Sequence, residues 1–134
     1  PDVALFVLPE YGGRCHYVDN YIGGPPELVV EVSASTKAVD FGPKLRLYRE
    51  AGIQEYVSVV EAESLVVWRS LDSGRYAELQ PDAAGVFRSR VFPGLWLDTA
   101  ALFGNDLAAM IRTLQTGLNS PGHAEFAALL VPRQ

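Results

Sequence analysis

The sequence predicts an α/β fold in which a mixed central sheet is flanked by helices, with further helices at the C-terminus. A β-branched run at Leu28 to Ser33 is followed by a helix-like segment, and short strand-like runs separated by turn residues extend from 54 to 91. The remaining segment has helical periodicity. A strand, a helix and then a meander imply parallel and antiparallel pairs within one sheet.

Length and composition favour one soluble domain spanning residues 1–134. A chain of 134 residues with 49% hydrophobic and 20% charged residues fits a single ordinary core. No apolar run is long enough to cross a bilayer, and no signal peptide pattern is present. The single Cys15 cannot form an internal disulfide, which favours a reducing cytoplasm. Because the chain enters an apolar run directly after Pro1, we expect an upstream portion to precede it.

The first elements bring charged residues into apolar surroundings. Val3 to Leu8 is expected to be a strand, and the Gly-, Pro- and Tyr-rich stretch 11–26 a long connection. Within Leu28 to Ser33, the alternation of a strand puts Glu31 on the same face as Val29 and Ser33. A carboxylate in so apolar a strand indicates a functional or ion-paired role.

The next segment is expected to be a helix. Pro43 suits its first position and Gly52 its C-terminal end, with Asp40 or Gly42 as the cap. One stripe of this helix carries residues at i, i+3, i+4 and i+7, which are Lys44, Leu47, Tyr48 and Ala51. Lys44 therefore lies at the edge that faces the core.

The rest of the chain is expected to supply packing elements. The predicted strands are 54–60, 64–69, 75–79 and 86–91, with hairpin turns at 61–63 and 72–74. The arginines at 69, 75, 88 and 90 are expected on solvated faces, and they would form a phosphate track if they lay on the side of Glu31. One tail helix has an apolar stripe from Leu107 to Leu118, and Ser120 with Pro121 begins another that runs through Leu130.

Asp2, Glu31 and Lys44 form the candidate site. Two neighbouring carboxylates repel each other unless a cation neutralises them, and hard oxygen ligands suit Mg²⁺ or Mn²⁺. Such an ion lowers the pKa of bound water, and a nearby ammonium can stabilise charge on a phosphate, which is what phosphodiester hydrolysis needs. The alternative for Glu31 is a buried ion pair with Lys44 or Lys37.

Other residues have weaker claims. Ser33 as a nucleophile would need a nearby His, and no Gly-x-Ser-x-Gly elbow surrounds it, so Ser33 is expected to line the site or to hydrogen-bond the turn. Asp40 is chiefly a helix-cap candidate that could support the site, and the hydroxyl of Tyr48 could reach it. His16 and His123 share no ligand spacing with each other or with Cys15.

An ordered series of motifs runs through nearly all of the chain: Pro1-Asp2-Val3-Ala4, the run from Pro25 to Ser33, Asp40 with Gly42 and Lys44 to Tyr48, Ala51 to Tyr56, and Phe92 to Leu95. This series resembles the Uma family of bacterial domains, which is assigned to the PD-(D/E)xK restriction-endonuclease-like superfamily. The resemblance implies that Asp2 is the PD aspartate and Glu31 the (D/E) residue. It also implies that Ser33 stands at the usual Lys position, with Lys44 on the following helix supplying the amine.

The resemblance also implies an activity. We expect Asp2 and Glu31 to hold Mg²⁺ or Mn²⁺, Lys44 to assist the attacking water, and DNA to be the substrate, with a homodimer where both strands are cut. The net charge of −5 argues mildly against a general nucleic-acid binder, although Lys37, Lys44, Arg46 and Arg49 form a local basic group. The alternatives are an inactive nuclease-fold domain for binding or assembly, and a Ser hydrolase.

Overall fold

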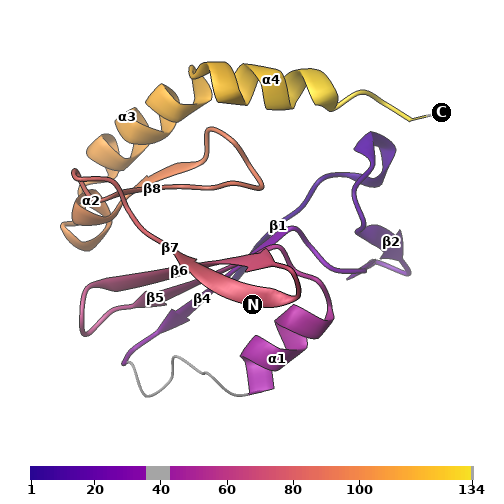
Figure 1. Cartoon of the computed structure of the whole chain (residues 1–134), viewed down its shortest axis with the longest axis horizontal. Coiled ribbons are helices and arrows are strands. Elements are labelled where there is room, and N and C mark those ends of the chain that lie inside the picture. Colours follow the sequence, from indigo (N-terminus) through magenta and orange to yellow (C-terminus); the bar gives the residue numbers. More distant parts are fainter. Residues whose placement is uncertain (36–42, 134) are drawn as a thin grey trace. The chain divides into compact units, whose positions relative to one another are not determined.

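The computed structural model describes residues 1–35 and 43–133, which belong to two compact units (Figure 1). One unit is Pro1–Glu78 with Val131–Gln134, and the other is Leu79–Leu130. The predicted cap residues Asp40 and Gly42, and Lys37 with them, lie outside the described residues. Within the described part, the helices are all too short or too polar to span a membrane.

The first unit is built on a five-stranded sheet in the order β1-β4-β5-β6-β7. The strands are β1 (Val3–Leu5), β4 (Leu28–Ser33), β5 (Glu55–Val60), β6 (Leu65–Asp72) and β7 (Arg75–Leu79). β1 pairs antiparallel with β4, β4 parallel with β5, and β5 antiparallel with β6. The predicted mixed central sheet is confirmed, and β4 lies between an antiparallel and a parallel neighbour.

Helix α1 (Pro43–Glu50) connects the parallel strands β4 and β5 and packs on the sheet through Tyr48. Tyr48 forms a core cluster with Val29, Ile53 and Tyr56. Gly52 has a φ of 74°, a conformation that suits glycine just past a helix end, and the next N–H, of Ile53, donates to the Tyr48 carbonyl at 3.0 Å. The helix therefore ends where the sequence predicts, and its buried side faces β4 and β5.

The connection before β4 is more regular than the sequence predicts. It contains a 3-10 turn, η1 (Pro9–Tyr11), and a hairpin of β2 (His16–Val18) and β3 (Tyr21–Gly23). Asp19 and Asn20 form the two-residue turn with φ of 47° and 70°, a conformation that these two residue types tolerate better than most. The hairpin escaped prediction because its strands are only three residues long.

The second unit holds β8 (Val86–Arg88), β9 (Trp96–Asp98), α2 (Thr99–Phe103), α3 (Leu107–Leu118) and α4 (Pro121–Leu129). The predicted strand 86–91 stops at Arg88, and β8 pairs with β9 in a separate two-stranded sheet. After β8, Ser89 accepts a hydrogen bond from the Phe92 N–H, and Gly94 adopts a φ of 100°, so the chain turns back. The predicted cap Ser120 accepts from the His123 N–H at 3.3 Å and begins α4.

Candidate functional site

Glu31 lies in the centre of the sheet with only 8% of its surface exposed. It belongs to β4 and is paired with Ser58 of the parallel strand β5. Alternation along β4 puts Glu31 on the same face as Val29, which is the face that packs against Tyr48 of α1. A buried carboxylate is costly unless hydrogen bonds or opposite charges compensate for its lost hydration.

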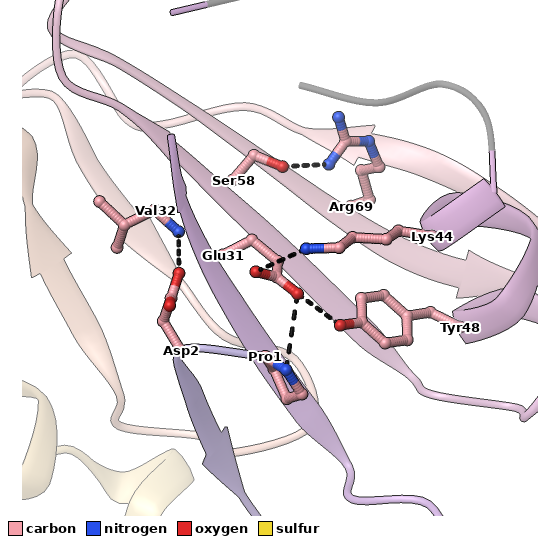
Figure 2. Close-up of polar contacts among 8 residues, drawn as sticks. All are labelled: Pro1, Asp2, Glu31, Val32, Lys44, Tyr48, Ser58 and Arg69. Atoms are coloured by element: carbon pink, nitrogen blue, oxygen red, sulfur yellow. Dashed lines mark hydrogen bonds and ion pairs between the residues drawn. The ribbon is translucent and has the colours of Figure 1, made fainter. Parts of the chain in front are cut away.

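Two side chains of α1 supply that compensation. The Tyr48 hydroxyl donates to Oε1 of Glu31 at 2.5 Å, and Nζ of Lys44 lies 3.3 Å from Oε2 (Figure 2). The nitrogen of Pro1 is 3.6 Å from Oε1. Lys44 and Tyr48 are four residues apart, so they project from neighbouring turns of one helical stripe and reach the two oxygens of one carboxylate.

The environment of Glu31 favours its ionised form. Burial acts to raise the pKa of the Glu31 carboxyl, but hydrogen bonds from Tyr48 and Lys44 and the positive charge of Lys44 outweigh it, so the pKa lies below its usual value of 4.5. Burial first, and then the hydrogen bond to Glu31, raise the pKa of the Tyr48 hydroxyl well above its usual range. Tyr48 therefore remains a proton donor to a carboxylate at neutral pH.

Asp2 lies on the other side of β4. In the register of the two strands Val3 is paired with Val30, yet the Asp2 N–H also donates to the Val30 carbonyl at 3.0 Å. Asp2 and Val3 therefore both face Val30, as in a β-bulge. A regular antiparallel register would have put Asp2 opposite Glu31, with both side chains on the same face of the sheet. Instead, Oδ2 of Asp2 accepts a hydrogen bond from the Val32 N–H at 2.6 Å, and Figure 2 shows Asp2 across the strand from Glu31.

Ser58 and Arg69 extend the polar part of this sheet face, and sequence reasoning missed both. The Nη1 group of Arg69 donates to Oγ of Ser58 at 2.9 Å (Figure 2). The guanidinium also lies over the Tyr56 ring, 4.7 Å from its centroid. Tyr56 in turn meets the Tyr48 ring edge-on at 5.0 Å. Arg69 is only 3% exposed, so the expectation of a solvated face is wrong for it.

The only sequence signal for Arg69 was β alternation, which puts its side chain on the opposite face of the sheet from that of the neighbouring Trp68. That pattern shows that one of the two residues points to each face, but it does not say which face α1 covers. The pairing of Arg69 with Tyr56 decides this, and the sequence does not specify the register.

The remaining candidates stand apart from Glu31 in their contacts. The carbonyl of Ser33 accepts from the Glu61 N–H at 2.9 Å, and in residues 1–35 and 43–133 no hydrogen bond joins the Ser33 hydroxyl to a histidine. His123 lies in the second unit, where its Nδ1 is 2.9 Å from the Pro93 carbonyl. Cys15 is buried, with its thiol 3.7 Å from the Gly24 carbonyl. Asp40 falls outside the described residues.

Carboxylate oxygens are the donors that a small divalent cation takes, but Glu31 and Asp2 present theirs on opposite sides of β4. Mg²⁺ typically takes one or two carboxylates and completes its shell with water and substrate phosphate. Glu31 and Asp2 supply such oxygens, and Oδ1 of Asp2 has no hydrogen-bond donor within the described residues. The same part of the chain contains no cluster of three or more His, Cys, Asp or Glu residues suited to a metal.

Comparison with known proteins gives one family. No curated protein sequence matches this chain. The Uma2 family model, described as "Putative restriction endonuclease", matches residues 1–100, a region that includes the whole sheet, α1 and the surroundings of Glu31. The mixed sheet and its helices are consistent with a restriction-endonuclease-like fold. Because the match covers well over half of the chain, this protein belongs to the Uma2 family.

Proposed function

We propose that this protein hydrolyses DNA phosphodiester bonds with the aid of Mg²⁺ or Mn²⁺, at a site centred on Glu31. The observation that carries the proposal is the pairing of a buried, ionised carboxylate with an ammonium group 3.3 Å away, in a chain of the Uma2 family. Perturbed ionisable groups that converge from different elements are typical of functional sites.

In this proposal the chain's own residues have separate roles. Glu31 is the main metal ligand, and Asp2 is the second, which requires its carboxylate to turn from the Val32 N–H toward the face of Glu31. When bound, the ion activates a water molecule and polarises the phosphate. Tyr48 holds Glu31 in place and keeps it ionised.

Lys44 is the residue we assign to the phosphate. Its side chain is 57% exposed on a helix surface, yet its ammonium lies beside the Glu31 carboxylate. An ammonium in this position can orient the attacking water or stabilise the negative charge that develops on the phosphate oxygens. Because the Lys44 side chain is half in solvent, it can move to the substrate without burying its own charge, while Glu31 keeps the Tyr48 hydrogen bond and would gain the cation of this proposal.

Nicking of supercoiled plasmid in Mg²⁺ or Mn²⁺ tests the proposal. We expect Glu31→Gln to abolish nicking and Lys44→Met to slow it by about 100-fold or more, the usual effect of removing one group that stabilises transition-state charge. Because Lys44 is largely exposed, Lys44→Met should change the free energy of unfolding by only about 1 kcal/mol or less. Arg75→Gln, an exposed change on β7, is the control and should nick normally. Equal nicking by wild type and Glu31→Gln would refute the proposal.

A second function is favoured by the position of Asp2. With Asp2 held at the Val32 N–H and Glu31 compensated by Lys44 and Tyr48, the structure suits a nuclease fold that binds without cutting. Such a protein would bind DNA or a protein partner, and Mg²⁺ would not alter its affinity. Purified wild type that binds duplex DNA but never nicks it, with either ion, would favour this alternative.

A further inference from the structure

Helix α1 gathers positive charge on a chain that is acidic overall. The net charge is −5, yet the eight residues of α1 include Lys44, Arg46 and Arg49, with Glu50 as their one carboxylate. A fourth cation, Arg14, meets the end of the helix, where its Nη2 donates to the Gly52 carbonyl at 2.9 Å. The positive potential of the first unit is therefore concentrated around one helix.

Arg46 and Arg49 have no structural task within the described residues. Both are exposed, and in residues 1–35 and 43–133 neither side chain forms an ion pair or a hydrogen bond. The polar contacts of α1 with the sheet are made by Tyr48 and Lys44, which reach Glu31. Within the part of the chain that the structure describes, the guanidinium donors of the two arginines are therefore available to a phosphate.

The helix also fixes these arginines close to the candidate site. Lys44 and Arg49 are five positions apart, which spans about 7.5 Å along a helix axis, or roughly two nucleotides of a DNA strand. Guanidinium groups bind phosphates with paired hydrogen bonds, and Leu47 between them is 60% exposed and can contact sugars. The axial spacing is close to that of successive phosphates, but at about 100° per residue Arg46 and Arg49 project roughly 200° and 140° round the helix from Lys44. A nucleic-acid strand therefore has to pass over the outer surface of α1 to reach them from the side of Glu31.

We propose that the outer surface of α1 binds the sugar-phosphate backbone of DNA through Arg46 and Arg49. The complementary charges are a cationic helix and a polyanion. It follows, if the function proposed above holds, that the site acts on a polynucleotide in preference to a small phosphodiester, because only a polynucleotide reaches these arginines. Backbone contacts of this kind position the substrate and carry no sequence preference.

Binding of a short fluorescein-labelled DNA duplex, measured by anisotropy in EDTA over a range of salt concentrations, tests this proposal. We expect Arg46→Gln with Arg49→Gln to weaken binding and to reduce the slope of log K against log salt by about 0.9 for each lost phosphate contact. Arg46→Lys with Arg49→Lys should retain most of the slope of log K against log salt, because the positive charges remain. Glu50→Gln should tighten binding because it removes the one negative charge of α1.

The matched control is Arg75→Gln with Arg112→Gln, which removes the same charge at exposed positions outside α1. The control should bind close to wild type. Absence of binding by wild type, an unchanged slope in the α1 double variant, or an equal loss in the control would each overturn the proposal. Wild-type binding without any cleavage in Mg²⁺ or Mn²⁺ would overturn the nuclease function and leave the α1 surface intact.

Discussion

Tyr48 is the residue on which the state of Glu31 most directly depends. It donates the shortest contact that Glu31 makes, at 2.5 Å, and its own ring is held by the edge of Tyr56. Without that donor, the buried carboxylate would retain Lys44, whose side chain is 57% exposed and interacts with water as well. A hydrogen bond to a charged group contributes about 1.5–3 kcal/mol, more than a neutral one.

Tyr48→Phe is expected to lower the free energy of unfolding by about 1–3 kcal/mol at neutral pH. The pKa of Glu31 is depressed by folding, so its contribution is present above the usual value of 4.5 and is lost as pH falls through the folded pKa. The difference between wild type and variant should therefore shrink in acid. Urea unfolding at neutral pH and at about pH 3 measures it.

The matched control is Tyr76→Phe. The Tyr76 hydroxyl donates to the Ile53 carbonyl at 2.7 Å, an acceptor that does not titrate. Removal of the Tyr76 hydroxyl should lower the free energy of unfolding by about 1 kcal/mol at both pH values. If Tyr48→Phe lowers the free energy of unfolding by the same amount in acid as at neutral pH, the hydrogen bond of Tyr48 is not coupled to the ionisation of Glu31.

At this scale, local periodicity predicted the location of the site and tertiary register decided its details. Alternation in β4 and the spacing of Lys44 and Tyr48 on α1 placed Glu31 and these two side chains on approaching faces. The rest of the predicted stripe was wrong, because Leu47 is 60% exposed and Leu45 packs against the core in its place. Asp2 is displaced by one extra residue facing Val30, which the sequence does not signal. Arg69 depends on pairing between strands, and pairing is not a local property.

At the scale of elements, Gly117 sets how closely α3 approaches the turn before β9. A Cβ at this position would lie 2.2 Å from the Gly94 carbonyl oxygen and 2.7 Å from Cγ of Trp96. Gly94 belongs to the turn and itself has a φ of 100°, and Trp96 is the first residue of β9. The helix can therefore pack here only with a residue that lacks a side chain.

Gly117→Ala should destabilise the protein by about 1–3 kcal/mol, because overpacking against backbone forces the helix away. Helix propensity alone predicts the opposite, a gain of about 1 kcal/mol. Gly122→Ala in α4 is the control, since its Cβ would meet only Pro93 Cβ at 4.0 Å, and it should be neutral or stabilising. Thermal unfolding followed by circular dichroism compares the two, and a stabilised Gly117→Ala would contradict this account.

Elements with strong local signals were predicted, and those without were not. Pro43 and Gly52 bracket α1, and Ser120 with Pro121 begins α4, because capping depends on a few adjacent residues. The sequence did not reveal β9, which has three residues and is held by its partner β8. The end of β8 depends on the hydrogen bond that the Phe92 N–H donates to the Ser89 side chain, which hydrophobic periodicity does not reveal.

On the scale of the whole molecule, the two units differ in how much core they have. Among the described residues, twelve hydrophobic side chains are buried, and only Phe87 and Ala101 of these belong to the second unit. A unit of roughly fifty residues buries too little surface to be more than marginally stable alone. The single domain predicted from chain length would unfold in one transition, whereas a second unit stabilised only by its own core would unfold at lower urea than the first.

The two tryptophans allow a direct test. Trp68 lies in β6 of the first unit and Trp96 in β9 of the second. In single-tryptophan variants, Trp96→Phe and Trp68→Phe, the fluorescence transition in urea should coincide with the transition seen by far-UV circular dichroism. A Trp96 signal that changes at lower urea than the circular dichroism of the same variant would show that the second unit unfolds separately.

The fold class followed from the sequence because it depends on the order of elements, which periodicity conveys. Strand, helix and strand at Leu28 to Val60 require a parallel pair with a helix across it, and the structure has β4, α1 and β5 in that arrangement. The division into two units depends on which strands pair, and the separation of β8 from the central sheet was not visible in its composition.

That strand-helix-strand unit also bears on how the protein folds. Glu31, Lys44, Tyr48 and Ser58 all belong to one continuous stretch between Leu28 and Val60. Closing a loop of this length costs little chain entropy compared with longer-range pairings, so the unit is a natural nucleus for the transition state of folding. Glu31, Lys44 and Tyr48 would then come together in the transition state of folding, whereas Asp2 lies outside this unit. Substitutions among them would slow the folding rate more than they speed unfolding.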